Sequence, residues 1–267
     1  MKRWMTLALI VAPAFSATSL DNGYNEMYNL DFAAAHRTFA EYQRAHPQDP
    51  MGPVSDAAAY LFSEFDRLHI LQSEFFVHDQ HFVTDHKLTP DPEIKRRFDE
   101  ALENAGRLAA LTPDTKNSMF ANVLRSGLRS DYMALIEKRY APSLREMKAG
   151  RELAERLLAI DPSFADAWLA VGIENYMLSI KPAPVRFFLR LSGARTDRDT
   201  GLAKLKITAE KGRYLAPFAR LMLAVAAMRD NKPNEAKVLL SDLVRDYPRN
   251  PLYAQELSRL QTGIARP

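Results

Sequence analysis

Cysteine is the residue that this chain lacks altogether, with none among 267 residues. Without a thiol the chain forms no disulfide, offers no thiolate to a metal and has no cysteine nucleophile. A lipid anchor attached to cysteine is excluded for the same reason. The fold must therefore be stable without covalent cross-links.

Glycine is also scarce, at 10 residues, whereas the helix-favouring residues alanine, leucine, arginine and glutamate are frequent. No stretch alternates polar and apolar residues in the way that a half-buried strand does. With 47% hydrophobic and 26% charged residues, the composition is that of a globular chain and not of a disordered one. We therefore expect an all-α protein.

Strong charge of one sign is missing as well. The formal charge is +3, and it falls to +1 when Lys2 and Arg3 of the predicted leader are set aside. No long lysine and arginine block is present, so we expect no nucleic-acid partner. The chain also lacks G-x-S-x-G, a P-loop, H-E-x-x-H and a dinucleotide fingerprint. We therefore expect no enzymatic activity and no cofactor.

Residues 1–16 have the three parts of a secretory signal peptide. Lys2 and Arg3 form a basic start, residues 7–12 are an uninterrupted apolar run, and Ala14-Phe15-Ser16 offers a small-x-small cleavage site. We therefore expect an exported protein, periplasmic or secreted. No later segment has 18 uninterrupted apolar residues, so we expect no stable membrane insertion after the leader is cleaved.

A repeated spacing is the most informative feature of the sequence. A small residue is followed by a large apolar residue four positions later and by a proline eight positions after that. Two segments carry this spacing in full: Ala35, Phe39 and Pro47, and Ala236, Leu240 and Pro248. The small residue lets two helices approach, the large one fills the gap beside them, and the proline ends the unit.

A third segment carries the spacing in part, with Gly150 and Pro162 in place and Ala154 where a large residue is expected. The helix predicted after Pro162 contains Trp168 and Gly172, which fit the W-x-x-L-G opening of a helical repeat, with Val171 in place of the leucine. With these motifs the chain resembles divergent tetratricopeptide repeat (TPR) proteins. It is also loosely similar to their outer-membrane and lipid-droplet-clearance branch.

The resemblance implies an α-solenoid of TPR-like helical hairpins. It covers about two thirds of a single helical domain, residues 17–267, with recognisable units at about 22–62, 143–180 and 214–263. The three closing prolines are 115 and 86 residues apart, which does not fit the roughly 34-residue period. We therefore expect helical insertions between the units.

The apolar periodicity, caps and breakers give approximate helix bounds. We expect Ser55 to be an N-cap and residues 77–92 to form a loop. The expected helices span residues 22–29, 32–46, 55–76, 93–111, 115–141, 142–160, 164–180, 185–191, 199–211, 214–229 and 234–247, with a terminal helix after 250.

An α-solenoid offers a concave surface lined by the first helix of each hairpin. We therefore predict a non-enzymatic scaffold or adaptor of the cell envelope that binds a protein or peptide segment. Helices 55–76, 164–180 and 214–229 are expected to line its groove. The predicted contacts are Tyr176, Met177, Val225, Met228 and Arg229.

Two other functions stay open. His78, His81 and His86, with two aspartates among them, suggest a metal-dependent or small-molecule enzyme, although their spacing matches no established metal site. The basic and aromatic segment 185–191 suggests a peripheral membrane factor. The plainer interpretations are a solvated loop for the histidines and, for the segment, a connector that packs on the solenoid through Phe188 and Leu191. Glu64 and its charged neighbours are expected on a solvated helix face.

Overall fold

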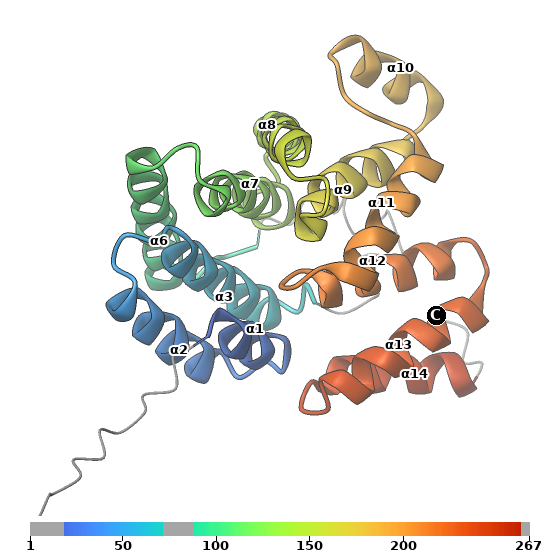
Figure 1. The fold of residues 1–267 in the computed structure, drawn as a ribbon. Helices are drawn as coiled ribbons and strands as arrows, with labels where there is room; N and C mark the ends of the chain where they lie inside the picture. Colours follow the sequence, from blue (N-terminus) through green and yellow to red (C-terminus); the bar gives the residue numbers. More distant parts are fainter. Residues whose placement is uncertain (1–18, 72–87, 263–267) are drawn as a thin grey trace, which may run out of the picture.

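The computed structural model describes residues 19–71 and 88–262, and the regular structure in these ranges is entirely helical (Figure 1). The prediction of an all-α fold is confirmed, while the predicted leader lies outside the described residues. The helices are α1 (Leu20–Tyr28), α2 (Phe32–Ala45), α3 (Met51–Arg67), α6 (Pro92–Leu111), α7 (Lys116–Asp131), α8 (Tyr140–Ile160), α9 (Trp168–Ser179), α10 (Ala183–Leu191), α11 (Arg198–Lys211), α12 (Ala216–Arg229), α13 (Pro233–Asp246) and α14 (Pro251–Thr262).

The helices pack as consecutive hairpins, in agreement with the predicted solenoid-like array. The pairs are α1 with α2, α3 with α6, α7 with α8, α9 with α11, and α12 with α13, and α14 packs on the last pair. Helices lie between the recognisable units, as expected: α6 and α7 follow the first unit, and α10 and α11 follow the second, with α10 placed between the paired helices α9 and α11. Among the described helices, none is both long and apolar enough to cross a membrane.

Side-chain caps explain several of the helix starts. Ser19, Asp31, Asp91, Thr115 and Asp197 each accept a hydrogen bond from a backbone N–H of the first turn that follows. These bonds satisfy donors that an isolated helix end would leave unpaired.

Ser55 is not an N-cap, contrary to the prediction. Helix α3 begins at Met51, because Pro53 lies in the first turn, where a proline leaves no hydrogen bond unmade. Ser55 is consequently a buried residue in the body of the helix, and its hydroxyl donates to the phenol oxygen of Tyr24 at 3.1 Å.

The small–large–proline spacing marks places where helices approach closely. Ala35, Phe39, Ala236 and Leu240 are fully buried, as is Ala154 of the partial unit. The three prolines of the pattern each stand two residues after a helix end: Pro47 after α2, Pro162 after α8 and Pro248 after α13.

The closest approaches between helices occur at glycines. A Cβ at Gly23 would lie 2.3 Å from the Phe39 ring, and one at Gly150 would lie 3.3 Å from Ser126 Cβ. A Cβ at Gly172 would lie 2.9 Å from the Leu205 side chain of α11. Trp168 at the start of α9 is partly buried, and the Lys204 ammonium of α11 lies 3.9 Å from its ring centroid.

The array curves so tightly that its late turns touch its first hairpin. The Tyr24 ring of α1 stacks on Tyr214 with centroids 4.8 Å apart, and the Arg213 guanidinium donates two hydrogen bonds to Asp21. A second contact joins the Asn250 amide to the Tyr28 carbonyl at 2.9 Å. The concave side is therefore a narrow hollow and not a long open groove.

We predict that Gly201→Ala destabilises the fold by about 1–3 kcal/mol. A Cβ at Gly201 would lie 2.6 Å from the backbone nitrogen of Tyr176, where no flexible side chain can move aside. Chemical denaturation measures the change. The control is Gly127→Ala, because nothing lies within 4 Å of a Cβ there, and alanine should stabilise α7 by up to about 1 kcal/mol. Equal effects at both positions would contradict the tight α9–α11 contact.

Candidate functional site

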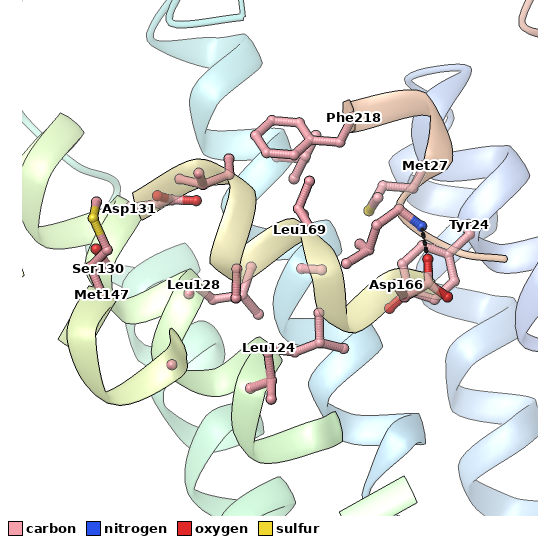
Figure 2. A pocket seen from close by; sticks show the side chains of 18 of the residues that line it. Tyr24, Met27, Leu124, Leu128, Ser130, Asp131, Met147, Asp166, Leu169 and Phe218 are labelled. Atoms are coloured by element: carbon pink, nitrogen blue, oxygen red, sulfur yellow. Dashed lines mark hydrogen bonds between the residues drawn. The ribbon is translucent and has the colours of Figure 1, made fainter. Parts of the chain in front are cut away.

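The inner side of the array forms an apolar cavity that is partly open to solvent (Figure 2). The hollow measures about 900 Å³ with its open solvent included, and the centre of a water molecule can move within about 110 Å³ of it. The first helix of each hairpin contributes to the wall. Representative side chains, one or two from each helix, are Met27, Phe62, Phe65, Leu128, Leu169 and Phe218.

Two of these helices are apolar on nearly every side, which explains how they serve both the core and the cavity. Helix α9 packs Tyr176 into a cluster with α11 and α12, while Leu169 and Ile173 line the cavity. Helix α12 buries Met222 in that cluster and directs Phe218 to the cavity. A helix that is hydrophobic all round is buried on more than one side.

Gly127 on α7 lies at the solvent-exposed edge of this hollow. Among the described glycines it is the one with nothing within 4 Å of the position that a Cβ would take, and it lines the cavity. A glycine inside a helix costs about 1 kcal/mol relative to alanine. At this position no close helix contact requires a glycine, and a side chain there would extend into the open space beside α7.

The polar groups of the wall lie at opposite ends of the cavity in Figure 2, with Ser130 and Asp131 at one end and Asp166 at the other. The Asp166 carboxylate accepts the backbone N–H groups of Arg213, Tyr214 and Leu215. These bonds hold the turn before α12, so Asp166 has a structural role. Burial raises its pKa, and the three N–H bonds partly oppose that shift.

Asp131 has a different environment. Among the described residues its carboxyl has no hydrogen-bond partner, and the surrounding protein raises the pKa of Asp131 to about 7 by desolvation. The side chain is half-buried because it faces the hollow. The neighbouring Ser130 hydroxyl is paired with Ser143 at 3.0 Å. Asp131 is thus a polar group of the cavity wall that is available to a ligand.

The backbone is irregular next to this carboxyl. Helix α7 ends at Asp131, and a π-helical turn, Tyr132–Ile136, follows at once. Such turns are rare and frequently occur at functional sites. The sequence predicted one helical stretch over 115–141, and the π-helical turn interrupts that stretch.

The five predicted groove contacts do not form a groove. Tyr176 and Val225 are buried in the cluster between α9, α11 and α12, where a partner on the surface reaches neither. Met177 and Met228 pack at the edge of the same cluster, and Arg229 at the end of α12 is partly buried. The prediction is corrected for Tyr176 and Val225 because the apolar side chosen as the groove is the one that packs on α11.

The other candidate residues divide into two groups. His78, His81 and His86 lie outside the described residues, and within 19–71 and 88–262 no three His, Asp or Glu side chains are placed to hold a metal ion. Glu64, expected on a solvated face, is instead buried. It forms a two-bond ion pair with Arg67 and accepts the backbone N–H of Asp91, which fixes the start of α6 beside α3.

Gly127 and Asp131 are absent from the residues predicted for the site, although the sequence carries a signal for them. They are four positions apart and therefore share one face of α7. That face also carries Val123, Leu124 and Leu128, which line the same cavity. A glycine and a carboxylate on an apolar helix face are unusual enough to indicate a cavity.

Comparisons with protein-family models, with curated proteins and with solved structures gave no significant match. The assignment of the candidate site consequently depends on the geometry of this chain alone.

We predict that Asp131→Asn stabilises the protein at pH 8 by on the order of 3 kcal/mol and that this gain disappears towards pH 4. Asp131 has a raised pKa in the folded state, so the unfolded chain loses this proton first as the pH rises. Wild-type stability is therefore lost between about pH 4 and pH 7. Denaturation of both proteins at several pH values measures the effect. The exposed Asp114→Asn serves as the control, and a gain at Asp131 that is independent of pH would contradict the desolvated carboxyl.

Proposed function

We propose that the protein is a non-enzymatic adaptor of the cell envelope, which holds a protein or peptide segment by an apolar side chain inserted in the central cavity. The observation that carries this proposal is the apolar hollow beside Gly127, lined by the first helices of successive hairpins. Its place in the cell envelope follows from the predicted leader. The resemblance to TPR proteins, which present partners with a concave surface, supports the same function.

The lining favours an inserted side chain over a buried peptide backbone. Backbone N–H and C=O groups that enter an apolar space without partners cost several kcal/mol in total. The wall offers few groups to satisfy them, since Asp166 is already bonded to three backbone amides and Ser130 to Ser143. The partner's backbone therefore stays at the mouth of the hollow, and a leucine, phenylalanine or tryptophan side chain enters.

Asp131 favours a second candidate function, the binding of a small amphiphile. An apolar molecule with a hydroxyl or amine at one end would fill the same hollow and hydrogen-bond to this unpaired carboxyl. A raised carboxyl pKa is also a feature of general acids and bases. The neighbouring Ser130 hydroxyl is hydrogen-bonded to Ser143 and not to Asp131, so we favour binding over catalysis.

We predict that Gly127→Phe abolishes partner binding and that Gly127→Ala retains it. The phenylalanine ring would occupy the space next to α7, whereas a methyl group leaves most of it empty. Selection of a displayed peptide library on the wild-type protein, followed by titration of the enriched peptides against both variants, measures the effect. The expected peptides share one large apolar residue and bind Gly127→Phe at least tenfold more weakly than Gly127→Ala.

Equal affinity of the enriched peptides for both variants would place their site elsewhere and contradict the proposal. If no peptide is enriched but an apolar fluorescent amine binds the wild type and not Gly127→Phe, the small-amphiphile function is the correct one. Thermal denaturation of the two variants confirms that each is folded before binding is compared.

A further inference from the structure

Helix α10 exposes its apolar side chains to solvent instead of packing them. The exposed fractions are 45% for Val185, 60% for Phe187, 68% for Phe188 and 70% for Leu191, and no residue of the helix is buried. In Figure 1 this helix stands away from the rest of the array. The expectation that it packs on the solenoid through Phe188 and Leu191 is therefore wrong.

The two arginines of α10 bond to groups at the base of the helix, while Arg186 remains partly exposed and Arg190 exposed. The Arg186 guanidinium donates to the backbone carbonyls of Ser179 and Lys181 at 3.0 and 3.1 Å, and Arg190 donates to the Thr196 hydroxyl at 2.5 Å. On a surface helix the charged face normally points to water. Here the arginines fasten the helix to its own base, and the apolar face points outward.

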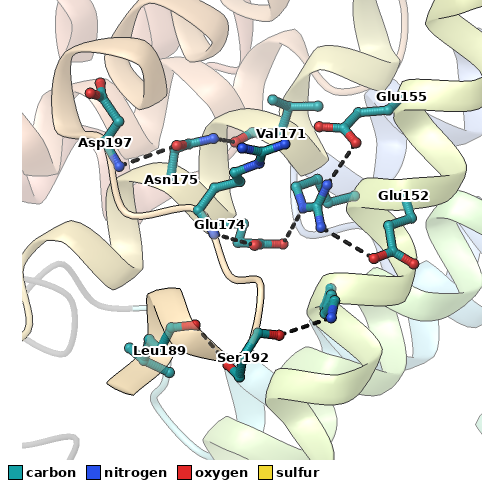
Figure 3. Close-up of polar contacts among 11 residues, drawn as sticks. Glu152, Glu155, Val171, Glu174, Asn175, Leu189, Ser192 and Asp197 are labelled. Atoms are coloured by element: carbon teal, nitrogen blue, oxygen red, sulfur yellow. Dashed lines mark hydrogen bonds and ion pairs between the residues drawn. The ribbon is translucent and has the colours of Figure 1, made fainter. Parts of the chain in front are cut away.

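A buried polar network holds the base of this insertion (Figure 3). Arg151 of α8 is paired with Glu174 of α9 at 3.0 Å, and both side chains are buried. The other Glu174 oxygen accepts the backbone N–H of Arg195 at 2.8 Å, which fixes the chain where it returns from α10. Lys148 adds a bond to the Ser192 carbonyl at 2.9 Å. The outward position of α10 is thus built into the fold.

Charge identifies the kind of surface that this helix fits. Residues 180–196 contain four basic side chains and no acidic one: Lys181, Arg186, Arg190 and Arg195. We propose that α10 docks on an anionic lipid surface, with its apolar side chains in the boundary between headgroups and acyl chains and its basic residues at the anionic headgroups. With 9 residues the helix is too short to cross a bilayer, so it lies along the surface.

A second copy of the chain is a poorer occupant of the same face. A symmetric pair would place these four cations against four others with no carboxylate from the same segment between them, and like charges in contact disfavour association. Anionic lipid instead gains from each cation. This inference is independent of the central cavity.

The test is flotation of the purified wild-type protein with vesicles. We expect it to float with vesicles of phosphatidylcholine that contain about one third phosphatidylglycerol, more weakly at high salt, and much less with pure phosphatidylcholine. The double variant Phe188→Ser, Leu191→Ser should bind anionic vesicles at least tenfold more weakly. Its matched control is Leu111→Ser, Ile160→Ser, since these side chains are 70% and 64% exposed on α6 and α8.

A charge variant, Lys181→Gln with Arg195→Gln, separates the electrostatic contribution. Each lost cation should weaken binding to anionic vesicles about fivefold. Failure of the wild type to float with anionic vesicles, or equal flotation of both double-serine variants, would overturn the proposal. So would wild-type dimerisation in sedimentation that Phe188→Ser, Leu191→Ser abolishes without vesicles. Peptide binding in the cavity should not change in any α10 variant, so the two proposals fail separately.

Discussion

The contact between the first hairpin and the late turns is the constraint on which the inner surface depends. Asp21 and Arg213 are 192 positions apart and form a two-bond ion pair, beside which Tyr24 stacks on Tyr214. An exposed ion pair of this kind contributes little stability by itself. The stacked tyrosines, with Tyr24 buried and Tyr214 partly buried, add the larger share, and together these contacts turn an open array into one that surrounds a hollow.

The wall of this hollow contains two residues, Gly127 and Asp131, that selection for stability alone would replace. A larger residue at position 127 would fill space and favour the helix, and an uncharged one at 131 would remove a desolvated carboxyl. Both positions therefore lower stability in exchange for volume and a polar group inside the array. Natural proteins accept such local costs at functional sites. Helix α10 carries a similar local cost on the outer surface. Its four exposed apolar side chains stand on a base that is held by a buried ion pair.

The sequence allowed much of the fold to be predicted, because caps, prolines and apolar spacing act locally. Pro47, Pro162 and Pro248 each follow a helix end as expected. Ser55 was misassigned since a proline in a first turn does not delay the start of a helix. The site was harder to predict for two reasons. Helices α9 and α12 are apolar on nearly every side, so periodicity alone does not separate their core side from their cavity side. The closing contacts also join distant residues, which no local pattern reveals.

The central claim is that the curved array forms an apolar cavity beside α7. Apolar cavities in proteins bind xenon. Crystals of the wild-type protein under xenon pressure test the claim most directly. The account predicts anomalous density for xenon between Gly127, Leu128 and Phe218, and its loss in Gly127→Phe crystals. Density that is absent from the wild type, or that persists unchanged in Gly127→Phe, would contradict it.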